Sequence, residues 1–230
     1  MAQHYNPHIV TDGLVLCLDA ADKNSYPGSG TTWYDLSGNG YNGTLTNGPT
    51  FSSDKGGTIV FDGSNDHVNF GDVLNQAYSF SISCWINADN PTGNGWGSFC
   101  TKGMWDTWRF GLASDTGKIH LAVAGAAGWD EYYQSYFSPT VLSSNTWYYV
   151  AAVYNHTEDK IYHYINGQLD GSYDTLAGPN LTNNNNLYVG GSIDGYMFDG
   201  KIATSRVYDR ALSAKEVSQN FNAQRSRFGI

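Results

Sequence analysis

Short segments in which apolar and polar residues alternate recur along the chain, and this period of two residues is typical of β-strands. In residues 79–86 one face is formed by Phe80, Ile82, Cys84 and Ile86. Residues 147–154 alternate in the same way. A complete apolar face predicts an inner strand of two packed sheets. Trp85 and Trp147 lie within these segments, so we expect both rings in the core.

Turn and helix signals occur in the second half of the chain. Asn166-Gly167 separates two strand-like segments and tolerates the positive φ angles of a tight turn, so it predicts a β-hairpin. Residues 201–208 alternate again and lead to Ser213, which precedes Glu216 by three residues. Each of these two side chains can bond a backbone N–H of a first helical turn. We therefore expect one short helix over residues 213–224.

The whole pattern predicts a single all-β domain over residues 1–230, with an N-terminal arm at 1–12 and the short helix near the C-terminus. The 27 Gly and 17 Tyr among 230 residues favour short strands joined by tight turns. No linker, charge block or long repeat interrupts the sequence.

The charge of the chain argues against two classes of partner. The formal net charge is −9, with 12 Lys and Arg and no basic cluster, which disfavours nucleic acid and anionic membranes. No segment approaches the ~20 apolar residues of a membrane span, and the first residues lack the features of a signal peptide. We therefore expect synthesis in a cytoplasm, no membrane insertion, and buried thiols at Cys17, Cys84 and Cys100.

The sequence offers little for catalysis. Glycoside hydrolysis needs two carboxylates at a fixed separation, and the only glutamates are Glu131, Glu158 and Glu216, with no closely spaced strand-borne set. Nucleophile, zinc and phosphate-loop motifs are absent, and the six His are scattered. The sequence predicts a protein that is not an enzyme.

Aromatic residues concentrate beside polar residues where strands give way to loops. The candidate ligand-binding residues are Trp105, Asp106, Trp108, Arg109, Trp129, Asp130, Tyr132, Tyr133, Asp194 and Tyr196. Flat rings stack on the apolar faces of sugars while Asp and Arg bond the hydroxyls, and exposed aromatics also form protein contacts. A glycan or a protein is compatible with this set. The alternative is that half of the rings only cover the ends of the sheets.

Five ordered motifs resemble those of laminin G-like, concanavalin A-type domains. They are GLVLCLD at 13–19, TTWYDLSGNGYNGTL at 31–45, IVFDGSNDHVNF at 59–70, the core strands SFSISCWINA and WYYVAAVYN with the hairpin KIYHYINGQLDG, and FDGKIATSRVYDRALSAKEV at 198–217. The resemblance covers nearly the whole chain, with His67 where Tyr is usual. It implies a concanavalin A-like jelly-roll β-sandwich of two antiparallel sheets with one short C-terminal helix. It fixes no single function, because this fold carries many.

Calcium is the candidate cofactor. Asp62, Asn65 and Asp66 fall within five residues, and hard cations such as Ca²⁺ prefer carboxylate and amide oxygens. The resemblance implies a structural Ca²⁺ near this stretch and near the last strand, where Asp199 is the natural distant partner. The alternative is that Asp62 and Asp199 only form turns ahead of the glycines that follow them.

The opening and closing segments, at residues 8–40 and 219–230, resemble laminin G-like proteins of tailed bacteriophages. This implies a virion structural or decoration protein that is made in the host cytoplasm and released by lysis. Its expected partners are glycans or other virion subunits. Self-association is also expected, because several weak sites give a displayed protein avidity. The alternative is a carbohydrate-binding module of an exported glycan-active protein.

Overall fold

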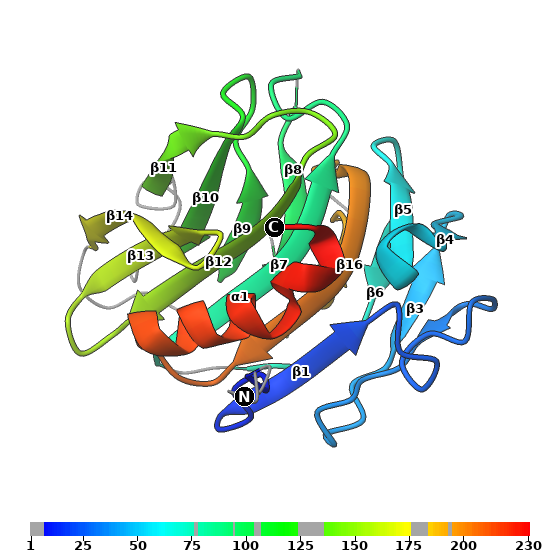
Figure 1. Ribbon diagram of the computed structural model, residues 1–230, viewed down its shortest axis with the longest axis horizontal. Coiled ribbons are helices and arrows are strands. Elements are labelled where there is room, and N and C mark those ends of the chain that lie inside the picture. The colour runs from blue at the N-terminus through cyan, green and yellow to red at the C-terminus, as the bar shows by residue number, and fades with distance from the viewer. Residues whose placement is uncertain are drawn as a thin grey trace, which may run out of the picture.

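The computed structural model describes residues 7–75, 78–93, 95–103, 107–123, 136–175, 184–192 and 195–230. The strands form two antiparallel sheets that pack face to face, and a helix near the C-terminus lies against the outer face of one of them (Figure 1). The predicted β-sandwich is therefore confirmed. Within the described ranges, no helix is long and apolar enough to cross a membrane.

Sheet I is the sheet that carries the helix. Its strand order is β14-β13-β12-β7-β16-β5-β4, and β1 pairs with β16 beside this path. The bounds are β1 Leu14–Asp19, β4 Thr50–Ser52, β5 Thr58–Asp62, β7 Phe80–Ala88, β12 Trp147–Asn155, β13 Lys160–Ile165, β14 Gln168–Asp174 and β16 Asp199–Tyr208. The short 3-10 helix η1, Asp54–Gly56, connects β4 to β5.

Sheet II has the strand order β11-β10-β9-β8-β15-β6-β3-β2. The bounds are β2 Thr32–Trp33, β3 Gly43–Thr46, β6 His67–Asn69, β8 Gly97–Lys102, β9 Trp108–Leu112, β10 Lys118–Val123, β11 Tyr136–Val141 and β15 Leu187–Val189. Neighbouring strands of this sheet come from distant parts of the chain, as where β15 pairs with both β6 and β8.

The main core fills the space between the two sheets. Phe80 of β7 stacks on Trp108 of β9, with ring centroids 5.4 Å apart, and both side chains are fully buried. The alternating apolar face of residues 79–86 lies in this core, as predicted. Cys84 and Cys100 also lie here, and Cys17 is buried on β1, so the expectation of buried thiols is confirmed.

A second, smaller core lies on the other face of sheet I, beneath the helix α1, Ala214–Phe228. Trp85 stacks on Phe228 with ring centroids 3.8 Å apart and on Phe221 at 5.8 Å. Trp147 packs against Phe228 as well. Trp85 and Trp147 are both buried, as predicted, but in this helix-covered core and not between the sheets.

The local signals for the helix and the hairpin are confirmed. Ser213 and Glu216 form a reciprocal capping box at the start of α1. The helix continues past the predicted end at residue 224, because Gly229 takes up the left-handed conformation that ends it, with φ of 79°. Asn166 and Gly167 join β13 to β14 with φ angles of 49° and 74°. Val10 of the predicted N-terminal arm donates its backbone N–H to Asn220 of α1.

The capping glutamate predicts a pH dependence of stability. Arg210 bonds Glu216 at 2.6 Å, and this contact, together with Ser213, lowers the pKa of Glu216 from 4.5 to about 2. A carboxylate whose pKa is lower in the folded chain than in the unfolded chain stabilises the fold at pH values above its unfolded pKa. This stabilisation is lost as the pH falls to the folded pKa. We expect the free energy of unfolding to decrease between pH 4.5 and about 2, measured by urea unfolding.

The matched variants are Glu216→Gln and Glu158→Gln. Glu216→Gln should flatten the dependence over this interval, because its side chain no longer titrates. Glu158→Gln, in the exposed turn before β13, is the control for removing one carboxylate outside the helix cap. Equal slopes in the wild type and Glu216→Gln would contradict the role of this carboxylate.

Candidate functional site

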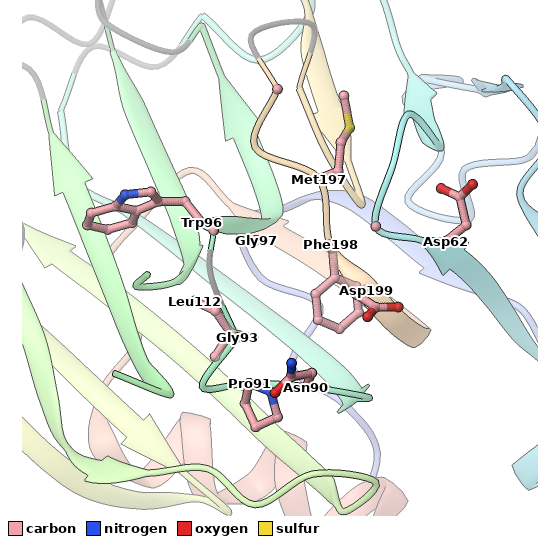
Figure 2. A pocket seen from close by; sticks show the side chains of 13 residues that line it. Asp62, Asn90, Pro91, Gly93, Trp96, Gly97, Leu112, Met197, Phe198 and Asp199 are labelled. Carbon is pink, nitrogen blue, oxygen red and sulfur yellow. The ribbon is translucent and has the colours of Figure 1, made fainter. Parts of the chain in front are cut away.

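An open pocket of about 230 Å³ lies at one end of the sandwich, where β5, β7 and β16 meet their loops (Figure 2). It is lined by Asp62, Gly63, Asn90, Pro91, Gly93, Gly95, Trp96, Gly97, Leu112, Gly195, Met197, Phe198 and Asp199. Five of these residues are glycines, so much of the wall is backbone that a ligand can approach closely. In Figure 2, Trp96 lies on one side of the pocket and Asp62 on the other.

The acidic wall comes from two neighbouring strands. Asp62 at the end of β5 lies directly opposite Asp199 at the start of β16, so both side chains leave the same face of sheet I. The backbone N–H groups of Ser64 and Asn65 donate to Asp62 and lower the pKa of that carboxyl. Burial, and then the charges of Asp89 and Asp62, raise the pKa of Asp199. The wall therefore presents hydrogen-bond acceptors in a negative potential.

The aromatic wall is held in place by a buried cation. The guanidinium of Arg109, on β9, lies over the rings of both Trp96 and Tyr196, at 4.6 Å and 4.4 Å from their centroids. Arg109 is only 4% exposed. A cation over two aromatic rings is attracted to both, more strongly where water is excluded. This contact fixes the indole of Trp96 on the pocket wall.

A buried histidine supports the same indole. The ring of His120, on β10, meets Trp96 edge-on at 4.8 Å. Burial, and next the charge of Arg109, lower the pKa of His120 well below its ordinary value. Neither ring nitrogen has a hydrogen-bond partner in the part of the chain that the structure describes. A neutral His120 therefore packs beside Arg109 without adding a second positive charge.

The predicted aromatic residues have different outcomes. Trp108 was expected to bind a ligand, and this is wrong, because its ring is fully buried between the sheets. Arg109 is covered by Trp96 and Tyr196, so it positions these rings and does not offer a free guanidinium. Tyr196 is half-buried beside the pocket and stays a prediction. Seven further predictions lie outside the described residues: Trp105, Asp106, Trp129, Asp130, Tyr132, Tyr133 and Asp194.

Two of the four predicted calcium ligands bond backbone N–H groups with their side chains. Asp62 accepts from the backbone N–H groups of Ser64 and Asn65, which is the turn that the sequence offered as the alternative. Asp66 is buried and accepts the backbone N–H of Asp62 at 3.2 Å. Asp199 begins β16 and does not form a turn. Asn65 uses its backbone oxygen for Asn47 and His67. Among the described residues, no group of three or more His, Cys, Asp or Glu could hold a metal ion.

Sequence reasoning missed Trp96 and Asn90. They lie in the loop NPTGNGWG, which contains one aromatic residue among glycines and polar residues. The predicted ligand site rests on clusters of aromatic residues, and Trp96 is a lone aromatic residue in its loop. An aromatic residue in a glycine-rich loop after a core strand is the signal that could have found it.

The sequence and the fold together assign the chain to a family. The laminin G family model described as the concanavalin A-like lectin/glucanases superfamily matches residues 62–218, and the chain belongs to this family. No sequence among the curated proteins matches the chain.

Solved structures show the same fold at low identity. The binding domain of Paraclostridial Mosquitocidal Protein 1 is 20% identical with a TM-score of 0.71, and 93% of this chain covers 52% of that one. The ligand-binding domain of botulinum neurotoxin serotype D, in complex with N-acetylneuraminic acid, is 19% identical with a TM-score of 0.70, at coverages of 94% and 52%. The chain thus spans about half the length of these binding domains.

A third structure matches over nearly its whole length. Domain 4 of AbnA, an extracellular arabinanase of glycoside hydrolase family 43 from Geobacillus stearothermophilus, was solved with arabinotriose. It is 18% identical with a TM-score of 0.68, and the match covers 90% of this chain and 97% of that domain. At these identities the comparisons show a shared fold.

Proposed function

We propose that this protein binds a saccharide in the pocket formed by Asp62, Asn90, Trp96 and Asp199. The observation that carries the proposal is a pocket lined by two carboxylates, an amide and Trp96, whose ring is held in place by Arg109. An aromatic face stacks on the apolar face of a sugar ring, while carboxylates and amides bond its hydroxyls. The complexes of similar folds with arabinotriose and with N-acetylneuraminic acid support the ligand class.

We propose further that the protein is not an enzyme. Two of its three glutamates have structural partners, since Glu216 bonds Arg210 and Glu158 accepts from Tyr162. The similar structures are binding domains, which supports a binding role. The pair to test is Asp62 and Asp199, because hydrolysis with retention needs carboxyls ~5 Å apart. Cleavage of a bound oligosaccharide that is lost in Asp199→Asn would overturn this part of the proposal.

The biological setting that we propose is the virion of a tailed bacteriophage, where the protein would serve as a structural or decoration protein that adheres to glycans. The resemblance of residues 8–40 and 219–230 to such proteins supports it. The second candidate is a carbohydrate-binding module of an exported glycan-active protein. The match in size to a single domain of an extracellular arabinanase favours that candidate. Mass spectrometry of purified phage particles separates the two.

The binding test is a glycan array followed by calorimetric titration of the glycans that bind. Trp96→Ala should weaken binding at least about 10-fold, the scale of losing a central aromatic contact. Asp199→Asn keeps the shape of the side chain and should weaken binding by a similar factor, because a charged acceptor is lost. Wild-type affinity in both variants would contradict the pocket assignment.

Tyr34→Ala is the matched control, because Tyr34 is 43% exposed and lies outside the pocket. It should bind as the wild type does. The array is run with calcium and with a chelator. Binding that needs calcium would support the predicted metal role of Asp62, Asn65, Asp66 and Asp199, and equal binding would assign these residues to turns and to the sugar.

A further inference from the structure

A second pocket, of about 320 Å³, lies away from the first. Its wall includes Tyr41, Leu74, Asn75, Tyr78, Ser79 and Asp209. Ser79 directly precedes β7 and Asp209 directly follows β16. The first pocket lies at the opposite ends of these two strands, at Asn90 and Asp199. A strand of nine residues spans roughly 26–30 Å, so the two pockets are separate.

The second pocket has an exposed aromatic wall. Tyr78 is 67% exposed, and its ring leans on His156 with centroids 5.5 Å apart. Tyr41 is partly buried against the main core, so its position is fixed from below. A large aromatic side chain at the mouth of a pocket gives a ligand a rigid, amphipathic surface.

Several polar groups around these rings have hydrogen-bonding capacity left for a ligand. Within the described part of the chain, no hydrogen bond engages the phenol groups of Tyr41 and Tyr78 or the exposed carboxylate of Asp209. Ser79 accepts the backbone N–H of His156 at 2.9 Å, which leaves its own O–H to donate. Asn75 donates to Asp72 at 3.2 Å, which leaves its side-chain oxygen to accept. Hydroxyl groups of a ligand can both donate to and accept from this set.

The backbone of the pocket wall is strained. Leu74 has φ of 61°, in the left-handed region that a branched, bulky residue seldom adopts. Its side chain is nevertheless buried, at 7% exposure, in the main core. Strain that the surrounding structure maintains is found most often at binding sites. Leu74 and the next residue, Asn75, both line the pocket.

We propose that this pocket is a second saccharide site, for an uncharged sugar whose ring stacks on Tyr78 and whose hydroxyls bond Asp209 and Asn75. The choice of ligand class rests on the proposed function of the first pocket. The carboxylate at this mouth and the net charge of −9 disfavour acidic sugars. Two sites at opposite ends make the protein bivalent, so that one molecule links two glycan chains.

The experiment is an NMR titration of the ¹⁵N-labelled protein with arabinotriose, cellotriose and triacetylchitotriose, with N-acetylneuraminic acid as the acidic probe. Amides of Val15, Tyr41 and Leu74 report the second pocket, and those of Gly93 and Gly97 report the first. We expect at least one of the trisaccharides to shift the second-pocket amides in the wild type and in Trp96→Ala alike.

The variant pair Tyr78→Ala and Tyr78→Phe isolates the ring. Because Tyr78 is largely exposed, neither should disturb the fold. Tyr78→Ala should lower the affinity measured from the second-pocket shifts at least about 10-fold, and Tyr78→Phe should retain most of that affinity. Tyr34→Ala should bind with the affinity of the wild type.

The two proposals fail in different ways. Shifts confined to Gly93 and Gly97 would overturn the second site and leave the first. Shifts confined to Val15 and Leu74 would overturn the first site and leave the second. Unchanged binding in Tyr78→Ala, or stronger shifts with N-acetylneuraminic acid than with every trisaccharide, would also overturn the second site as described.

Discussion

Replacing Trp85 by alanine is expected to lower the free energy of unfolding by about 3–5 kcal/mol, the usual cost of removing a buried tryptophan. Trp85 is fully buried and stacks almost parallel on Phe228, with 9° between the ring planes. It also contacts Phe221 and Tyr149. The Trp85 ring is therefore a central contact between α1 and sheet I, and its loss leaves a cavity beneath the helix. Denaturant unfolding followed by circular dichroism measures the change.

Trp85→Phe is the matched variant for this prediction. It keeps an aromatic face for Phe228 and removes an indole N–H that has no hydrogen-bond partner among the described residues. We expect it to cost no more than about 1.5 kcal/mol, as for a modest loss of buried volume. If Trp85→Ala lowers the free energy of unfolding by less than about 1 kcal/mol, the helix is not anchored through this ring.

Replacing Gly190 by alanine is expected to cost about 2–5 kcal/mol, from strain and overlap together. Gly190 has φ of 79°, which is unfavourable for any residue with a Cβ atom. That Cβ would overlap the ring of Phe61, which is buried and packs against Phe198. Phe198 lines the first pocket, so the variant should also weaken saccharide binding.

Gly229→Ala is the control for backbone strain alone. Gly229 has the same φ of 79°, but a Cβ there meets nothing within 4 Å. It should cost only about 1 kcal/mol, the usual penalty of the left-handed region. Thermal and denaturant unfolding of both variants tests the difference. Equal losses would mean that Phe61 moves aside at little cost and that the close approach has no role.

The site shows how far sequence reasoning reached. Asp62 and Asp199 were singled out together, and the structure places them opposite each other in the pairing of β5 with β16. Their assignment to calcium rested on residue type, which turns and metal sites share. Trp108 and Arg109 were assigned to one ligand site because they are adjacent in sequence. Adjacent residues of a strand point to opposite faces of the sheet. Trp108 therefore enters the core, and Arg109 lies against the ring of Trp96.

The prediction of the helix shows the same difference between local sequence signals and tertiary contacts. Its start was predicted because the capping pair Ser213 and Glu216 is a local signal that bonds within one turn. Its end was placed too early: Gly229, which ends the helix, is also a local signal, while the stacking of Phe228 on Trp85 is a contact between distant residues that packs the last turn on sheet I.

The sequence alone determined the strands of the core, the Asn166-Gly167 hairpin, the helix start and, through its ordered motifs, the sandwich fold. These features depend on the period of side chains along the backbone and on turn chemistry, which are local properties. The tertiary structure alone decided which face each aromatic residue occupies and which loops meet in a pocket. Trp96, Asp62 and Asp199 come together only because strand pairing brings distant segments to one end of the sandwich, and pairing partners are not encoded in local periodicity.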